Sequence, residues 1–375
     1  MSYEMTPRER VLTALRHEEA DRVPVDLGSC GPTAIHISAY RSLLSYLGRK
    51  EDIILWDVVG QLAQPSEAIL EMVGADVRGI RASIYSSLQS ATSSYRVIDA
   101  WGTTWELRPS ATCYSIVACP LAGANSLTGY AFPDGKRLAS GDALRQRALR
   151  LQEEGRYAIL GEVAGHILER AQMIRGFDTF LVDLLENPAF AENLLDRILQ
   201  VETDIAETFL DAVGDTLDVF AFKDDFGMQS GPLMSLSMFR RVLKPRMRSY
   251  LDAVRKRTKA KIWFHSCGSV YYVIPDLIDL GVDILNPVQV AAWDMEPARL
   301  KREFGKHLCF WGGIDTQHTL PHGTPRDVEK EVGKRLEELS VGGGYVLASV
   351  HNIEADVPGE NVWAMFQTAL NRGRG

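Results

Sequence analysis

Short apolar runs recur along the chain, and stretches with helical periodicity separate most of them. Eight of these runs have the character of buried strands: VPVDLG, ADVRGI, YAILGE, LDVFAFKDD, KIWFHSC, VDILNPV, HLCFWGG and GYVLASVHN. Buried parallel strands are typically near-continuous apolar runs, and alternation of strands with helices is typical of a parallel sheet. Eight such units in 375 residues predict a (β/α)8 barrel, with a doubly wound sheet as the alternative.

Two segments stand outside this alternation. In TPRERVLTAL, Thr6 can cap a helix, Pro7 suits its first position and Glu9 completes a capping box, so we expect an N-terminal helix. Residues 83–138 contain tryptophans, β-branched residues and turn formers without a long helical period, which predicts an inserted β-hairpin or meander. No linker separates this insertion, so residues 1–375 are expected to form a single barrel domain.

Composition narrows the classes of partner. The formal net charge of −8 disfavours binding to nucleic acid phosphates or to an anionic membrane, because both need basic faces. No segment approaches the roughly 20 apolar residues that span a bilayer. The five cysteines are odd in number and scattered, which favours a reducing compartment over a disulfide framework. We therefore expect a cytoplasmic protein that acts on a small molecule.

The run KIWFHSCG places His265 and Cys267 directly after a predicted strand. In a barrel the carboxyl ends of the strands converge on one mouth, where such folds carry their chemistry. Thiolate and imidazole are preferred zinc ligands, and Gly268 allows a sharp turn that lets both reach one ion. A third ligand from another strand would leave one position open, as catalytic zinc requires. The alternative is that Cys267 is a small core residue.

Residues at the ends of other predicted strands are further candidates for catalysis or for binding a substrate or metal, and some of them also have a purely structural interpretation. The pair Asp224 and Asp225 could act as acid or base, or could cap the helix expected after them. The amides of Asn286 and Gln289 could bind substrate or tie loops together. The remaining candidates for substrate or metal binding at strand ends are Asp26, Trp311 and Glu162.

Several longer segments resemble one known superfamily. TPRERVLTALRHEEADRVPV, KDDFGMQSGPLMS, HSCGSVYYVIPDLIDLGVDILNPVQ, FWGGIDTQHTLPHGTP and HNIEADVPGENVWAMFQ are together similar to the uroporphyrinogen decarboxylase superfamily, in the same order. The resemblance covers most of the chain outside residues 83–155, and it implies a (β/α)8 barrel. It also implies one of two chemistries. One branch decarboxylates porphyrinogens without a cofactor; the other comprises zinc methyltransferases that serve corrinoid proteins and carry an H-x-C motif.

The residues favour the methyltransferase branch. The chain has His265-Ser-Cys267, and VPVDLGSCGPTAIH lacks the arginines with which decarboxylases hold a porphyrinogen after the first strand. Arg78 and Arg81 follow another strand, where they could bind one acidic group or be solvated surface charges. The resemblance therefore implies a Zn2+ enzyme and a corrinoid protein as partner. A cofactor-free decarboxylase and a non-catalytic ligand-binding barrel are the alternatives.

Two residues are equally good candidates for the third zinc ligand. The resemblance places His351 where methyltransferases acting on small thiols have a cysteine, and Glu162 is the equal alternative, with Asp225 behind both. A zinc ion with one thiolate is a stronger Lewis acid than one with two, which suits a leaving oxygen. We therefore expect transfer from an O-methyl compound to cobalt, although transfer in the reverse direction is compatible with the same residues.

Overall fold

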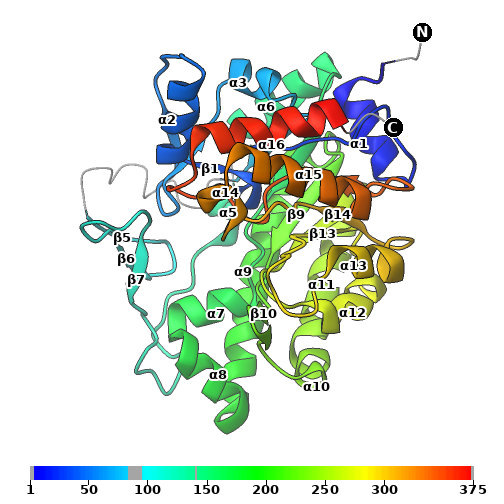
Figure 1. The fold of residues 1–375 in the computed structure, drawn as a ribbon. Coiled ribbons are helices and arrows are strands. Elements are labelled where there is room, and N and C mark those ends of the chain that lie inside the picture. The colour runs from blue at the N-terminus through cyan, green and yellow to red at the C-terminus, as the bar shows by residue number, and fades with distance from the viewer. Residues whose placement is uncertain (1–3, 83–94, 140–141, 373–375) are drawn as a thin grey trace.

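A curled parallel sheet forms the centre of the computed structural model, which describes residues 4–82, 95–139 and 142–372. Seven strands pair in the order β4-β8-β9-β12-β13-β14-β15. Their bounds are Val77–Arg81, Ala158–Glu162, Val219–Lys223, Lys261–His265, Ile284–Asn286, Cys309–Trp311 and Tyr345–Val346. Each matches one of the predicted apolar runs, and helices lie outside the sheet (Figure 1).

The predicted first strand closes the barrel. Val25 forms a parallel bridge with Leu347, and the backbone N–H of Asp26 donates to the Leu347 carbonyl at 3.0 Å. On the other side, the N–H of Asp76 donates to the Val25 carbonyl at 2.9 Å. The Val25 N–H donates to the Asp76 carboxylate and not to a backbone carbonyl, so the backbone pairing of this strand with its neighbour is short. The fold is a TIM-barrel-like (β/α)8 architecture, as predicted.

Two apolar layers hold the barrel together. Alternate strand residues point inward and fill the barrel with side chains from seven strands, including Trp263 and Trp311. Val11 and Leu15 belong to the same cluster, so the N-terminal helix α1 (Pro7–Ala14) plugs one end. The predicted capping box of Thr6 and Glu9 is present at its start. The second, larger cluster lies between the outer strand faces and the helices.

The helices that surround the sheet are mostly those expected from periodicity. Within residues 4–82, 95–139 and 142–372, none is long and apolar enough to cross a bilayer. Besides α1, they are α2 (Ile37–Tyr46), α3 (Glu67–Met72), α5 (Gly135–Leu138), α6 (Asp142–Glu154), α7 (Leu168–Arg175), α8 (Phe177–Glu186), α9 (Pro188–Val213), α10 (Leu236–Met238), α11 (Lys244–Arg255), α12 (Ile274–Asp279), α13 (Pro297–Phe304), α14 (Thr319–His322), α15 (Pro325–Leu339) and α16 (Gly359–Arg372).

Shorter antiparallel sheets lie outside the barrel. Strands β5 (Arg96–Ile98), β6 (Thr104–Glu106) and β7 (Ser115–Ala118) form a meander within the predicted insertion, whose residues 83–94 lie outside the described part. In Figure 1 this meander lies to the left of the barrel strands. β1 (Ile35–His36), β3 (Leu62–Gln64) and β2 (Ile54–Asp57) form another small sheet, and β10 (Gly227–Met228) pairs with β11 (Gly231–Pro232).

Candidate functional site

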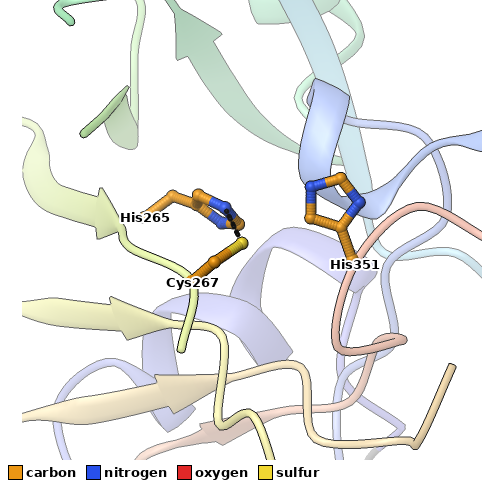
Figure 2. A group of neighbouring side chains, drawn as sticks. All are labelled: His265, Cys267 and His351. Carbon is orange, nitrogen blue, oxygen red and sulfur yellow. Dashed lines mark hydrogen bonds between the residues drawn. The ribbon is translucent and has the colours of Figure 1, made fainter. Parts of the chain in front are cut away.

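Three of the predicted metal ligands meet at the carboxyl ends of the strands. His265 ends β12, Cys267 follows two residues later, and His351 lies in the segment after β15. His265 Nε2 lies 3.1 Å from Cys267 Sγ. One ligand atom from each of the three side chains lies within 4.8 Å of the others. Figure 2 shows the three side chains grouped together. This nitrogen–sulfur–nitrogen cluster has the donor types that zinc prefers.

Asn286 fixes the orientation and tautomer of His265. The Asn286 amide nitrogen donates to the Trp311 carbonyl at 2.9 Å, so its Oδ1 faces His265 Nδ1, 2.5 Å away. An oxygen acceptor there requires the proton of the neutral ring on Nδ1, which leaves the Nε2 lone pair facing the cysteine. Burial lowers the pKa of His265 to about 3, so the ring is neutral at pH 7. Metal-binding histidines are typically held in this way.

The turn that carries Cys267 is held by its backbone. Its N–H donates to Asp225 Oδ1 at 2.8 Å, and the Gly268 N–H donates to Gln289 Oε1 at 2.5 Å. Gly268 has φ +80°, and a Cβ there would lie 2.4 Å from the Gly227 carbonyl carbon, so only glycine fits. Burial and the nearby Asp225 raise the pKa of the thiol well above its usual range. A cation at the cluster would reverse this by favouring the thiolate.

His351 faces the other two ligands from a separate segment. Its ring centroid lies 5.5 Å from that of His265, with the two planes at 62°. Burial, together with repulsion from His265, lowers its pKa to about 4. Both imidazoles are therefore neutral and able to donate a lone pair near pH 7. The chemistry of the donor set fits a zinc ion held by these three side chains.

Glu162, the alternative third ligand, is not part of the cluster. Its carboxylate accepts the Gly31 N–H at 3.1 and 3.0 Å, and it lies 3.4 Å from Lys223 Nζ. Asp225 lies closer, with Oδ1 4.0 Å from His265 Nε2. Of the oxygen donors that the sequence suggested, the structure therefore brings Asp225 beside the cluster and holds Glu162 away from it.

Asp224 has a structural role at a helix start. Its two carboxylate oxygens accept the backbone N–H groups of Ile167, Leu168 and Glu169 at 3.1, 2.7 and 2.7 Å. It thus caps the N-terminus of α7 from the end of β9. The sequence suggested a helix cap as an alternative for this residue, but for the helix that follows it in the chain rather than for α7.

The four residues predicted to bind substrate all have protein partners. Besides Asn286 and Gln289, Asp26 accepts the Trp311 indole N–H at 3.2 Å, and both of these side chains are buried. None of the four is among the described residues that line the main cavity. Their geometry is that of residues that position the strand ends, and contact between them and a substrate stays a prediction.

A cavity of about 890 Å³ opens at the barrel mouth. His265, His351 and Asp225 line it, so the nitrogen–sulfur–nitrogen cluster is at its wall. Much of the remaining wall is apolar: Val59, Leu62, Trp105, Tyr114, Ile116, Met173, Phe177, Met228 and Leu233. Trp105 and Tyr114 come from the region of the meander, which therefore forms part of the roof. Such an enclosure suits a small molecule with an apolar body.

The polar residues of this wall that sequence reasoning missed include His166, Glu169 and Lys223. His166 and Glu169 follow β8 by a few residues, and Lys223 ends β9 just before the two aspartates. Burial and the neighbouring Asp225 raise the pKa of Glu169 to about 7. The signal available was position, because Lys223 lies at the end of an apolar strand and the other two follow one, and the carboxyl ends of these strands meet at the mouth.

Comparison with known proteins identifies the family. The model of the family "Uroporphyrinogen decarboxylase (URO-D)" matches residues 139–371, well over half of the chain. The chain belongs to the uroporphyrinogen decarboxylase family. A curated relative, the uroporphyrinogen decarboxylase of Pseudoalteromonas translucida, is 24% identical over 222 residues, or 57% of this chain. The match spans 58% of that relative, less than two thirds of its length.

A solved structure shares the architecture of this uroporphyrinogen decarboxylase family member along nearly its whole length. The methyltransferase from Methanosarcina mazei superposes with a TM-score of 0.69, covering 98% of this chain and 99% of that one. Its sequence is 20% identical. At this identity the likeness shows the fold.

Proposed function

We propose that this protein is a zinc-dependent methyltransferase that moves a methyl group from a small O-methyl compound to the cobalt of a corrinoid protein. The observation that carries the proposal is the cluster of His265, Cys267 and His351 at the wall of an apolar cavity. Three protein ligands with nitrogen and sulfur donors are the arrangement of catalytic rather than structural zinc. The fold shared with a methyltransferase is consistent with this reading.

The residues around the cluster have distinct tasks in this reaction. When bound, zinc would supply the Lewis acidity that makes an ether oxygen a better leaving group. Asn286 holds the His265 ring with Nε2 toward the cysteine. Asp225 and Glu169 both line the cavity, and burial raises the pKa of each, so the pair can hold a proton near neutral pH for the released oxygen. The apolar part of the wall would contact the apolar body of the substrate.

Decarboxylation of a porphyrinogen is the second candidate, because the family and the curated relative carry that name. A substrate with many carboxylates needs several cations. The segment from Val23 to His36, in which the decarboxylases of this superfamily are expected to have arginines after the first strand, has none. The apolar wall of the cavity also fits such a substrate poorly. Metal-independent turnover that is unchanged by Cys267→Ser would favour this candidate.

The test begins with metal content. Elemental analysis of the full chain, purified without chelator, should find about one zinc per chain. Cys267→Ser and His351→Gln should lose it. Cys113→Ser is the matched control, because Cys113 is exposed and lines the same cavity away from the cluster.

Methyl transfer is then followed directly. Reduced cob(I)alamin is mixed with an aryl methyl ether and the protein, and formation of methylcobalamin is read from its absorbance. Zinc-loaded protein and the Cys113→Ser variant should transfer methyl, whereas Cys267→Ser should lose most of the rate. Methyl transfer at full rate by metal-free protein would overturn the proposal.

A further inference from the structure

A second, smaller hollow of about 220 Å³ adjoins the main cavity. It is lined by residues from β2, β4, β8 and α6, and three residues line both spaces: Asp57, His166 and Lys223. This side pocket therefore lies next to the cavity that contains the cluster. The proposed methyl transfer assigns no function to this side pocket.

Cations outnumber carboxylates in the wall of the side pocket. Arg81, Arg147 and Lys223 face Asp57 and Glu162. Burial raises the pKa of Asp57 and lowers the pKa of both Arg81 and Arg147. Arg81 and Lys223 lie 3.8 and 3.4 Å from Glu162, whereas Arg147 is more exposed to solvent. One additional anion beside Lys223 and Arg147 would balance the charge of the pocket.

The geometry of the side pocket is fixed by contacts within the protein. Arg81 donates to the carbonyls of Gly28 and Ser29, and its guanidinium lies 3.7 Å from the centre of the Trp56 ring. Glu162 is held by the Gly31 N–H and lies 3.4 Å from Lys223 Nζ. The pocket is thus assembled before any ligand arrives, which reduces the entropy lost on binding.

His166 supplies a second, independent observation. The residue is 4% exposed and stands where the two spaces adjoin. Among the described residues neither ring nitrogen has a hydrogen-bond partner; Nδ1 lies 3.4 Å from Glu169 Oε2 without hydrogen-bond geometry. Buried polar atoms of native proteins are usually satisfied, so an unsatisfied imidazole on a cavity wall points to a ligand with a polar group.

We propose that the side pocket binds the carboxylate of the substrate, while the methyl group and apolar body lie in the main cavity. The substrate class is then a methyl ether that carries a carboxylic acid, and the inference rests on the proposed function. Lys223 and Arg147 would form charge-assisted contacts with the carboxylate, and His166 would donate to it. The pocket thereby selects acids over neutral ethers of the same shape.

Binding of a matched pair of probes tests this proposal. Calorimetric titration of the full chain compares 3-methoxybenzoate with 3-methoxybenzamide, which has nearly the same shape without the charge. The acid should bind about tenfold more tightly, as expected for a charge-assisted contact. Arg147→Gln should weaken acid binding by about tenfold and leave amide binding unchanged, and Lys223→Gln should weaken acid binding by about tenfold. Equal affinity for the two probes, or an absence of acid binding, would overturn the proposal.

Arg150→Gln is the control variant, because Arg150 is an exposed cation one turn along α6 that does not line the pocket. Arg150→Gln should leave the affinities for the acid and the amide unchanged. If it lowers the affinity for the acid as much as Arg147→Gln does, the effect is one of general charge and the proposed carboxylate site is rejected. Circular dichroism checks that each variant is folded.

Repeating the titrations with zinc-loaded and chelator-treated protein separates this proposal from the proposed function. If the protein holds no zinc and transfers no methyl group, yet binds the acid more tightly than the amide in a way that depends on Arg147, the proposed methyltransferase function is rejected and the proposed carboxylate site is supported. If the protein binds zinc and demethylates the acid and the amide equally, and Arg147→Gln has no effect, the methyltransferase function is supported and the carboxylate site is rejected.

Discussion

Asn286 shows how a residue without metal contact determines the chemistry of a ligand. It joins the Trp311 carbonyl to His265 Nδ1 and so sets which ring nitrogen faces the cysteine. Asn286→Ala should lower zinc affinity by about 10–100-fold, the usual effect of removing such a partner. Competition with a chelating dye measures this affinity.

Asn286→Asp provides the matched comparison, because it keeps an oxygen acceptor for His265 and should recover part of the zinc affinity. Unfolding by urea, measured on metal-free protein, separates an effect on the ligand from a loss of stability. Equal zinc affinity in wild type and Asn286→Ala would show that the ring is oriented by other contacts.

The residues of the site differ in how far the sequence could predict them. His265 and Cys267 were predictable because they are close in the chain and follow an apolar strand. His351 came from the family resemblance, since no spacing connects it with the other two. The position of Glu162 outside the cluster could not be predicted, because its carboxylate accepts the N–H of Gly31, which is 131 residues away in the chain. Contacts between such distant segments are invisible to local patterns.

At the scale of an element, the start of α7 depends on one side chain. Asp224 accepts three backbone N–H groups there and is buried. Asp224→Ala should lower the free energy of unfolding by about 2 kcal/mol, because a cap is lost and buried donors are left unsatisfied. Asp225→Ala removes the acceptor of a single backbone N–H and should lower the free energy of unfolding by less, about 1 kcal/mol. Urea unfolding of both variants measures the difference, and equal losses would contradict the cap.

The capping box of α15 predicts a specific dependence on pH. Asp327 accepts from the Thr324 hydroxyl and backbone N–H, which lowers the pKa of Asp327 to about 2. A lowered pKa stabilises the folded state above the unfolded pKa of 3.8, and this stabilisation is lost as the pH falls through about 2.

Asp327→Asn should therefore melt below wild type at pH 6, and the gap should narrow as the pH falls from 4 to 2. Thermal unfolding followed by circular dichroism at several pH values tests this. A gap that is independent of pH would mean that the charge of Asp327 plays no part.

At the scale of the whole molecule, the eight strands were predictable because buried parallel strands are apolar along their length. The sequence could not show that the first is reduced to a short pairing, because the Asp76 side chain takes the Val25 N–H. It also did not show that residues Ile54–Asp57 form β2 and pair with β3 in a small antiparallel sheet outside the barrel. Strand propensity reports local conformation, whereas partners depend on the assembled chain.

The plug formed by the N-terminal helix should contribute to global stability. Leu15 is 3% exposed and belongs to the cluster that fills the barrel. Leu15→Ala should lower the free energy of unfolding by about 3 kcal/mol, because it leaves a cavity in a packed core. Leu185→Ala, at a position that is 71% exposed, is the control and should change it little.

Zinc affinity of folded Leu15→Ala protein should match wild type. The Leu15 carbonyl lies near Cys309 at the start of β14, whereas the cluster lies at the strand ends. A large loss of zinc affinity in this variant would indicate that the two ends of the barrel are coupled.

The meander contributes part of the cavity roof but no strand to the barrel. The cavity is thereby shaped in part by a stretch of polypeptide that carries none of the three candidate metal ligands. Over evolutionary time, mutations in the roof can change which compound is accepted without disturbing the strands that carry the reactive groups. Diversification of homologous enzymes toward new compounds would then begin in that inserted stretch.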